Sequence, residues 1–148
     1  MNLTELFEKQ RILDKKIEEK VQAFQPDFRM DSVETEMKLI FAIHVEFMEL
    51  ANEIQFFKYW KNHKNFNEER VLEEASDVLH CILSLANIRR YSKFIRNVEG
   101  IDSEELKFYP IEELFDQFRR INFDSSGQTI QAISLLLSII EKLGFSEE

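Results

Sequence analysis

The sequence is poor in the residues that turn or cross-link a chain. Its 148 residues include 3 glycines, 2 prolines and one cysteine, Cys81. Scarce glycine and proline argue against a fold built from many turns and strands. A single cysteine cannot form an internal disulfide, which is typical of proteins from a reducing compartment. We therefore expect a cytoplasmic, mainly helical protein.

The sequence also lacks a long apolar run and an excess of positive charge. The sequence has no run of about 18 apolar residues, so no membrane span is predicted. Near the N-terminus, charged side chains stand where a signal peptide would have its apolar core. The formal net charge is −9. This charge argues against general binding to nucleic-acid duplexes, because that affinity comes mostly from lysine and arginine on phosphate. A polyanionic small ligand would need metal ions as intermediaries.

The sequence is rich in apolar side chains with helical spacing. Hydrophobic residues make up 44% of the chain, and 14 residues are phenylalanine. A chain of this length buries about two-thirds of its unfolded surface in one domain. Most of the apolar pattern repeats with a period of about 3.6 residues, which predicts helices. We therefore expect a single all-α domain over residues 1–148.

Local signals at helix ends predict five helices. Thr4 is the expected N-cap of the first, and the segment 62–65 is a polar break before the third. The expected helices cover residues 4–24, residues from 32 or 33 to 57–60, and residues 67–96, 111–119 and 129–143. Packed side by side, they predict an antiparallel, four-helix-bundle-like core with an additional short helix.

Two pairs of carboxylates flank the apolar stripes of the second and third helices. The pairs are Glu46-x-x-Glu49 and Glu74-x-x-Asp77. A spacing of three residues places two side chains about 5–6 Å apart on one helical face. Four carboxylates in one pocket raise one another's pKa unless a cation compensates them. Because Mg²⁺ binds carboxylate oxygens and keeps positions open for water and phosphate, the pattern predicts a Mg²⁺ site.

The same acidic pairs also occur on solvated helix faces, and that alternative stays open from the pattern alone. The positions of the two pairs along their helix axes predict where the second helix ends. If the second helix stayed regular to Trp60, the two pairs would miss each other by roughly 9 Å at about 1.5 Å per residue. The pairs come level if this helix ends near Phe57.

These segments resemble a known family. The segment 46–61, EFMELANEIQFFKYWK, is similar to the first metal motif of the dimeric dUTPases, which belong to the all-α NTP pyrophosphohydrolase superfamily with the MazG-type enzymes. The segment 74–85, EASDVLHCILSL, resembles their second motif. The segment 10–14, QRILD, is similar to the part of their first helix that reads the base. The similarity covers residues from about 5 to 90.

The resemblance implies a reaction and a set of site residues. The reaction is Mg²⁺-dependent hydrolysis of dUTP to dUMP and diphosphate by a homodimer. Metal ligands would be the two carboxylate pairs, Glu46, Glu49, Glu74 and Asp77, and one of the first pair, with Glu46 preferred, would orient the attacking water. Implied substrate contacts are Gln10 and Asp14 for the uracil edge, His80 for the sugar or base, Lys58 and Lys61 for phosphate, and Trp60 beside these two lysines.

The chain departs from the family pattern at two places. Cys81 stands where the family usually has an aromatic residue, which leaves one wall of the base pocket in question. Family members also tend to continue with a phosphate-gripping segment rich in Lys, Asn and Arg, and this sequence reaches residue 148 where that segment would begin. Arg119 and Arg120 are weak candidates to replace it.

Three other functions stay open from the sequence. A MazG-like enzyme would act on other nucleotides. A di-iron bundle would need a second Glu-x-x-His beside Asp77-x-x-His80, which neither His44 nor His63 supplies. A non-enzymatic helical protein would show no metal dependence.

The phenylalanines in the second half of the chain are the candidates for a dimer surface. The residues proposed for a dimer interface or second-layer packing are Phe108, Phe115, Phe118 and Phe123.

Overall fold

The protein folds as an all-α domain, as predicted. The computed structural model describes residues 1–62 and 65–146, and over these residues six α-helices and one 3₁₀ turn account for the regular structure apart from an isolated bridge between Asn2 and Asn97. None of the helices in this part of the chain has the length and hydropathy needed to cross a bilayer. The elements are α1 (Thr4–Gln22), α2 (Val33–Ile54), α3 (Glu68–Ile88), η1 (Tyr91–Lys93), α4 (Ser103–Leu106), α5 (Ile111–Arg119) and α6 (Ser126–Lys142).

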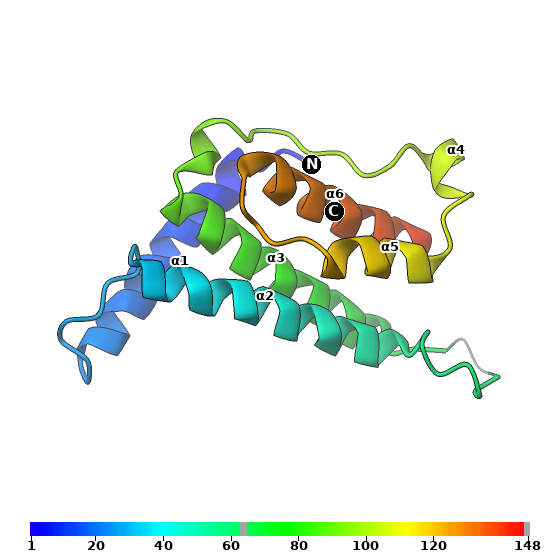
Figure 1. The fold of residues 1–148 in the computed structure, drawn as a ribbon, viewed down its shortest axis with the longest axis horizontal. Coiled ribbons are helices and arrows are strands. Elements are labelled where there is room, and N and C mark those ends of the chain that lie inside the picture. Colours follow the sequence, from blue (N-terminus) through cyan, green and yellow to red (C-terminus); the bar gives the residue numbers. More distant parts are fainter. Residues whose placement is uncertain (63–64, 147–148) are drawn as a thin grey trace.

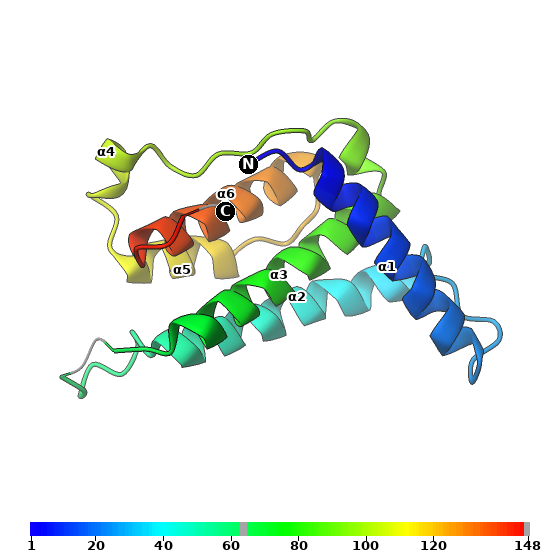
Figure 2. The same ribbon diagram turned by 180° about the vertical axis from the view of Figure 1, so that it is seen from behind.

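Two antiparallel helix pairs form the body of the molecule. The long helices α2 and α3 lie side by side, and α5 and α6 form a second pair stacked on them (Figure 1). Helix α1 does not align with this bundle and instead crosses α3 at one end, as both views show (Figure 2). The pair α2 and α3 shares the most extensive contact in the fold. The acidic flanks of these two helices are therefore held next to each other.

The start of α2 agrees with the sequence and its end does not. Ser32 is the N-cap, and its side chain accepts a hydrogen bond of 3.1 Å from the backbone nitrogen of Thr35. The helix ends at Ile54, so the prediction of an end at 57–60 was wrong. Gln55 adopts the left-handed region with φ of 60°. The turn brings the Phe56 ring to 4.5 Å from that of Phe115, and this tertiary contact replaces the expected last helical turn.

Helix α3 is also shorter than predicted, ending at Ile88 and not at 96. Arg89 is held by an ion pair of 3.0 Å to Glu36 and donates a hydrogen bond to the backbone carbonyl of Phe123. Arg90 then takes a left-handed conformation with φ of 61°. Helix α3 therefore ends because of contacts with distant parts of the chain, and no local sequence signal predicted this end.

Smaller differences concern the other helix ends. Leu3, and not Thr4, is the N-cap of α1, and Asn2 Oδ1 accepts a hydrogen bond of 3.0 Å from the Thr4 nitrogen. The short helix α4 was not predicted. Helix α5 has its predicted bounds, whereas α6 begins three residues earlier than expected because Ser125 caps it. In the predicted polar break, His63 and Lys64 lie outside the described residues.

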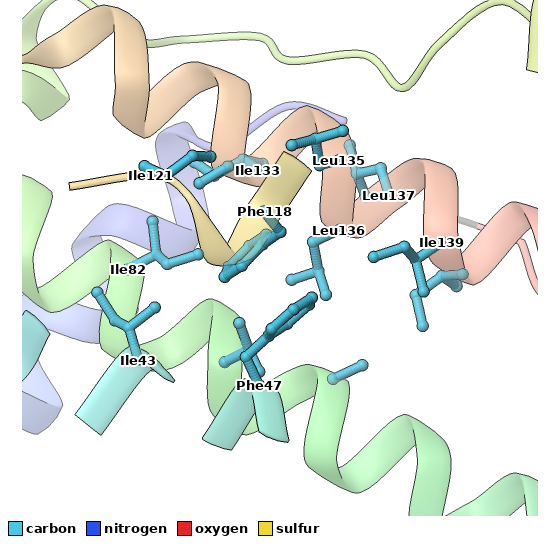
Figure 3. Close-up of a cluster of buried hydrophobic side chains, with 14 of the residues drawn as sticks. Ile43, Phe47, Ile82, Phe118, Ile121, Ile133, Leu135, Leu136, Leu137 and Ile139 are labelled. Atoms are coloured by element: carbon cyan, nitrogen blue, oxygen red, sulfur yellow. The ribbon is translucent and has the colours of Figure 1, made fainter. Parts of the chain in front are cut away.

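A stack of phenylalanine rings fills the centre of the core. Phe47 on α2 and Phe118 on α5 have ring centroids 3.8 Å apart, and both side chains are fully buried in the apolar cluster of Figure 3. Phe115 and Phe123 are also buried. Three of the four phenylalanines proposed for an interface or second-layer packing therefore belong to this chain's own core. Phe108 is the exception, with 84% of its surface exposed.

Candidate metal centre and an adjoining polar network

The carboxylates on α2 lie on the flank that faces α3. The core stripe of α2 is buried at Ile43, Phe47 and Leu50, as its helical spacing predicted. A rotation of about 100° per residue places Glu46 and Glu49 beside that stripe. On α3 the buried residues Val71, Ala75, Val78 and Ile82 form the matching stripe. The chain sequence therefore sets both acidic flanks at the same helix–helix contact.

Three of the four candidate metal ligands meet at this contact. Carboxylate oxygens of Glu46, Glu74 and Asp77 all lie within 4.8 Å of one another. In octahedral Mg²⁺ coordination, opposite oxygens are about 4.2 Å apart. A small rotation of the side chains would therefore let all three bind one cation. The pairs come level in a structure where α2 ends at Ile54, about one turn before the end near Phe57 that was predicted for this arrangement.

The fourth carboxylate, Glu49, lies at the edge of the cluster. It is exposed and is not one of the three closest groups. It nevertheless lies close enough to accept a hydrogen bond from protonated Glu46, and its negative charge repels Glu74. We define the carboxylate cluster as Glu46, Glu49, Glu74 and Asp77.

The environment of the carboxylate cluster disfavours negative charge. Burial, the hydrogen bond to Glu49 and the neighbouring carboxylates raise the pKa of Glu46 from 4.5 to about 7. Burial and the charges of Glu49 and Asp77 also raise the pKa of Glu74, although Arg70, 3.7 Å away, opposes this shift. A divalent cation would relieve this repulsion, and the all-oxygen donor set suits a hard cation such as Mg²⁺.

The raised pKa of Glu46 predicts a pH effect on the stability of the metal-free protein. Between pH 4.5 and about 7 the folded state binds more protons at Glu46 than the unfolded chain does. Stability therefore falls as the pH rises through this window. We expect the melting temperature in EDTA to decrease from pH 5 to pH 8, less so in Glu46→Gln, and Mg²⁺ to remove most of the decrease. A wild-type curve no steeper than that of Glu46→Gln would contradict this.

A buried polar network links α1 to α3 beside the carboxylate cluster. Gln10 Nε2 donates hydrogen bonds to Asp14 Oδ1 at 2.9 Å and to Ser84 Oγ at 2.8 Å. Ser84 Oγ donates to the same Asp14 oxygen at 2.7 Å. His80 Nδ1 lies 2.6 Å from Gln10 Oε1. We call Gln10, Asp14, His80 and Ser84 the Gln10 network.

The Gln10 network includes three residues that the sequence singled out and one that it did not. Gln10, Asp14 and Ser84 are buried, while His80 is exposed. Burial raises the pKa of Asp14, and hydrogen bonds from Gln10 and Ser84 oppose that shift. Ser84 was part of the quoted motif but was not assigned a role. The available signal was its position one helical turn after His80, on the same face of α3.

Cys81 is half-buried next to these groups. Burial, together with the charges of Glu46, Asp77 and Asp14, raises the pKa of its thiol from 9.0 to about 11. Where the family usually has an aromatic residue, this chain therefore has a small, neutral thiol.

The remaining predicted substrate contacts lie outside the carboxylate cluster, in the segment that follows α2 and at the end of α5. Lys58 and Lys61 line a cavity of about 500 Å³ at the C-terminal end of α2, together with Lys142, and none of the carboxylate cluster lines it. Trp60 is 64% exposed. Arg119 and Arg120, the weak candidates for phosphate binding, both pair with Asp116, at 2.7 and 3.1 Å.

Comparison with known proteins gives one match. A family model described as dUTPase matches residues 2–148, nearly the full sequence. No curated protein and no solved structure gives a significant match. The match includes every residue of the carboxylate cluster and of the Gln10 network.

Proposed function

We propose that this chain, which belongs to the dUTPase family, carries out the reaction of that family at the carboxylate cluster, with Mg²⁺ as its cofactor. Membership of the family assigns the reaction itself, which is hydrolysis of dUTP to dUMP and diphosphate. The family and the cluster together indicate a divalent metal ion. The choice of Mg²⁺, the roles of the residues and the assembly are the proposal.

The donor chemistry of the carboxylate cluster supports Mg²⁺. Its ligands are carboxylate oxygens, with Glu46 and Glu49 from α2 and Glu74 and Asp77 from α3. Mg²⁺ is commonly bound through carboxylates together with substrate phosphates. When bound, it would neutralise both the clustered acids and the triphosphate, and would stabilise charge on the reacting phosphorus.

Glu46 is the group proposed to act on water. Its carboxylate is half-buried and lies against Glu74 and Asp77. In this position it would orient a water molecule for attack between the α and β phosphates and accept its proton. The negative charge of Glu49 beside Glu46 opposes ionisation of this base, so a bound cation would help to keep Glu46 in its proton-accepting form.

The proposed contacts to the base, the sugar and the triphosphate follow from where the remaining site residues lie relative to the carboxylate cluster. The Gln10 network adjoins the carboxylate cluster through α3, where His80 follows Asp77 by one turn, so we assign it to the base and sugar. Lys58, Lys61 and Lys142 give the end of α2 a local positive charge in a chain of net charge −9. We propose that these lysines, with Trp60 beside them, attract the triphosphate.

The observation that carries this proposal is the meeting of Glu46 with Glu74 and Asp77 across two helices. Product analysis tests it. With Mg²⁺, dUTP should give dUMP and diphosphate, and EDTA should stop the reaction. A parallel panel with dCTP and dTTP would show whether the enzyme resembles the MazG-type enzymes in substrate range. Release of orthophosphate and dUDP, or turnover unaffected by EDTA, would contradict the proposal.

We also propose a homodimer, formed through an exposed apolar seam on α2. The seam lies on the other side of the buried stripe from Glu46, and its residues follow one another at intervals of three or four. Each is about half exposed or more: Val33, Met37, Phe41, Val45 and Met48. A helix with two apolar faces normally buries both. Antiparallel pairing of this seam with that of a second copy would cover it symmetrically.

The seam makes the dimer testable by substitution. Wild-type protein should give a mass of about 35 kDa in light scattering, twice the 17.7 kDa of one chain. Phe41→Glu places a charge in the seam and should shift the mass toward the monomer. Phe108→Glu, at an exposed phenylalanine away from α2, should leave the dimer intact. A wild-type mass of 17.7 kDa at micromolar concentration would reject the dimer.

A further inference from the structure

The direction of the hydrogen bonds in the Gln10 network is fixed by one carboxylate. Asp14 Oδ1 receives hydrogen bonds from Gln10 and from Ser84. An ionised carboxylate only accepts, so the Gln10 amide must turn its NH₂ group toward Asp14. Because the Ser84 hydroxyl proton points at Asp14, Ser84 Oγ can only accept a hydrogen bond from Gln10. Gln10 Nε2 donates that bond at 2.8 Å. A flipped amide would place its carbonyl oxygen against the Asp14 carboxylate.

The orientation of Gln10 then determines where the imidazole of His80 carries its proton. Gln10 Oε1 is the atom that faces His80, 2.6 Å from Nδ1. A carbonyl oxygen can only accept, so Nδ1 must donate. A neutral imidazole has one N–H. Its Nε2 therefore has a free lone pair, and no hydrogen-bond partner of Nε2 lies among the described residues of the chain.

We propose that Asp14 and Gln10 are positioning residues that hold His80 in its neutral Nδ1–H tautomer, so that Nε2 is a fixed hydrogen-bond acceptor for the base of the nucleotide. This inference rests on the proposed function, because it places the nucleotide between the carboxylate cluster and His80. Gln10 then acts on the base through His80, and not by the direct contact that the resemblance implied. Its Nε2 hydrogens are both committed within the network.

A fixed acceptor at this position distinguishes uracil from cytosine. Uracil carries a hydrogen on N3 and can donate it, whereas N3 of cytosine is a bare acceptor. Cytosine would place two lone pairs against each other, and both groups would lose a partner on leaving water. Leaving such groups unpaired lowers binding by about tenfold or more. The ligand class that this site selects is a ring with an imide N–H.

The tautomer can be measured directly in the ligand-free, metal-free protein. Two-bond ¹H–¹⁵N correlation spectra separate the two neutral imidazole forms, and His80→Gln identifies the His80 signals among the three histidines. We expect Nδ1–H for His80 in the wild type. Asp14→Asn offers an NH₂ group as well as an oxygen, so Gln10 is no longer held in one orientation and part of the His80 population should carry its proton on Nε2. Gln10→Ala removes the acceptor and should have the same effect.

Ser84→Ala is the matched control for this network. It removes a buried hydroxyl of the network but leaves the Asp14–Gln10 hydrogen bond, so His80 should keep its Nδ1–H. A wild-type His80 with Nε2–H would overturn the inference. So would an unchanged tautomer in both Asp14→Asn and Gln10→Ala, each checked for native folding by circular dichroism. Because these spectra need neither metal nor turnover, their outcome is independent of the proposed function.

Kinetics test the link between tautomer and selectivity. The ratio of kcat/KM for dUTP to that for dCTP should fall about tenfold or more in Gln10→Ala, and in the same direction but by less in Asp14→Asn. Ser76→Ala, an exposed position on α3, should leave the ratio unchanged. A changed tautomer with an unchanged ratio would overturn the role in base selection. Failure of the proposed function would instead appear as absence of Mg²⁺-dependent turnover in the wild type.

Discussion

Glu46→Gln is expected to lower kcat for dUTP by about 10²–10⁴-fold, the usual contribution of a positioned general base. The amide has nearly the same shape as the carboxylate but cannot accept a proton from water. Glu46 lies within 4.8 Å of Glu74 and Asp77, so the change also removes one charge from the cluster. Nucleotide binding should persist, because the remaining carboxylates and the Gln10 network are unaltered.

The control for this prediction lies on the same helix. Glu34→Gln makes the same substitution at an exposed residue near the start of α2 that pairs with Lys38, at 2.9 Å. Its turnover should stay close to wild type, since exposed ion pairs contribute little. Steady-state kinetics at saturating Mg²⁺ and titration of a non-hydrolysable dUTP analogue separate turnover from binding. Glu46→Gln with more than a tenth of wild-type kcat would exclude Glu46 as the base.

Phe118→Ala is expected to have the largest effect on stability. The Phe118 ring is fully buried and stacks on that of Phe47 with a centroid distance of 3.8 Å. Truncation of a buried phenylalanine to alanine costs about 3–5 kcal/mol, because the transfer free energy and the packing around the cavity are both lost. That loss is a large part of the total stability of a domain of this size.

Urea unfolding gives the measurement, with wild type and variants at the same protein concentration because assembly would add to the apparent stability. Phe108→Ala makes the same change at a side chain that is 84% exposed, and it should alter the free energy of unfolding by no more than about 0.5 kcal/mol. Equal effects of the two substitutions would contradict the packing of Phe118, on α5, against Phe47 of α2.

Helical periodicity in the sequence was enough to predict the parts of the site that lie on regular helix. The spacing of Ile43, Phe47 and Leu50 placed the buried stripe of α2, and the same rotation placed Glu46 and Glu49 beside it. These positions depend only on the geometry of a helix with one buried face. The fold class and the proximity of the acidic flanks followed from the same reasoning.

Features decided by contacts between distant segments were not predictable in this way. The end of α2 at Ile54 depends on the ring of Phe56 reaching Phe115, and the end of α3 depends on Arg89 bonding to Glu36 and Phe123. Ser84 shows the same limit. Periodicity placed it on the face of His80, but its hydrogen bonds depend on where α1 crosses α3.

The environment of Cys81 affects how the protein withstands oxidation. With a thiol pKa of about 11, only about one molecule in ten thousand carries the thiolate at pH 7. Peroxides and alkylating reagents attack the thiolate form, so the Cys81 side chain should resist both in the folded protein. Unfolding removes the burial that raises the pKa. The single thiol is therefore a chemical reporter of unfolding, unreactive in the native state and open to labelling once the helices separate.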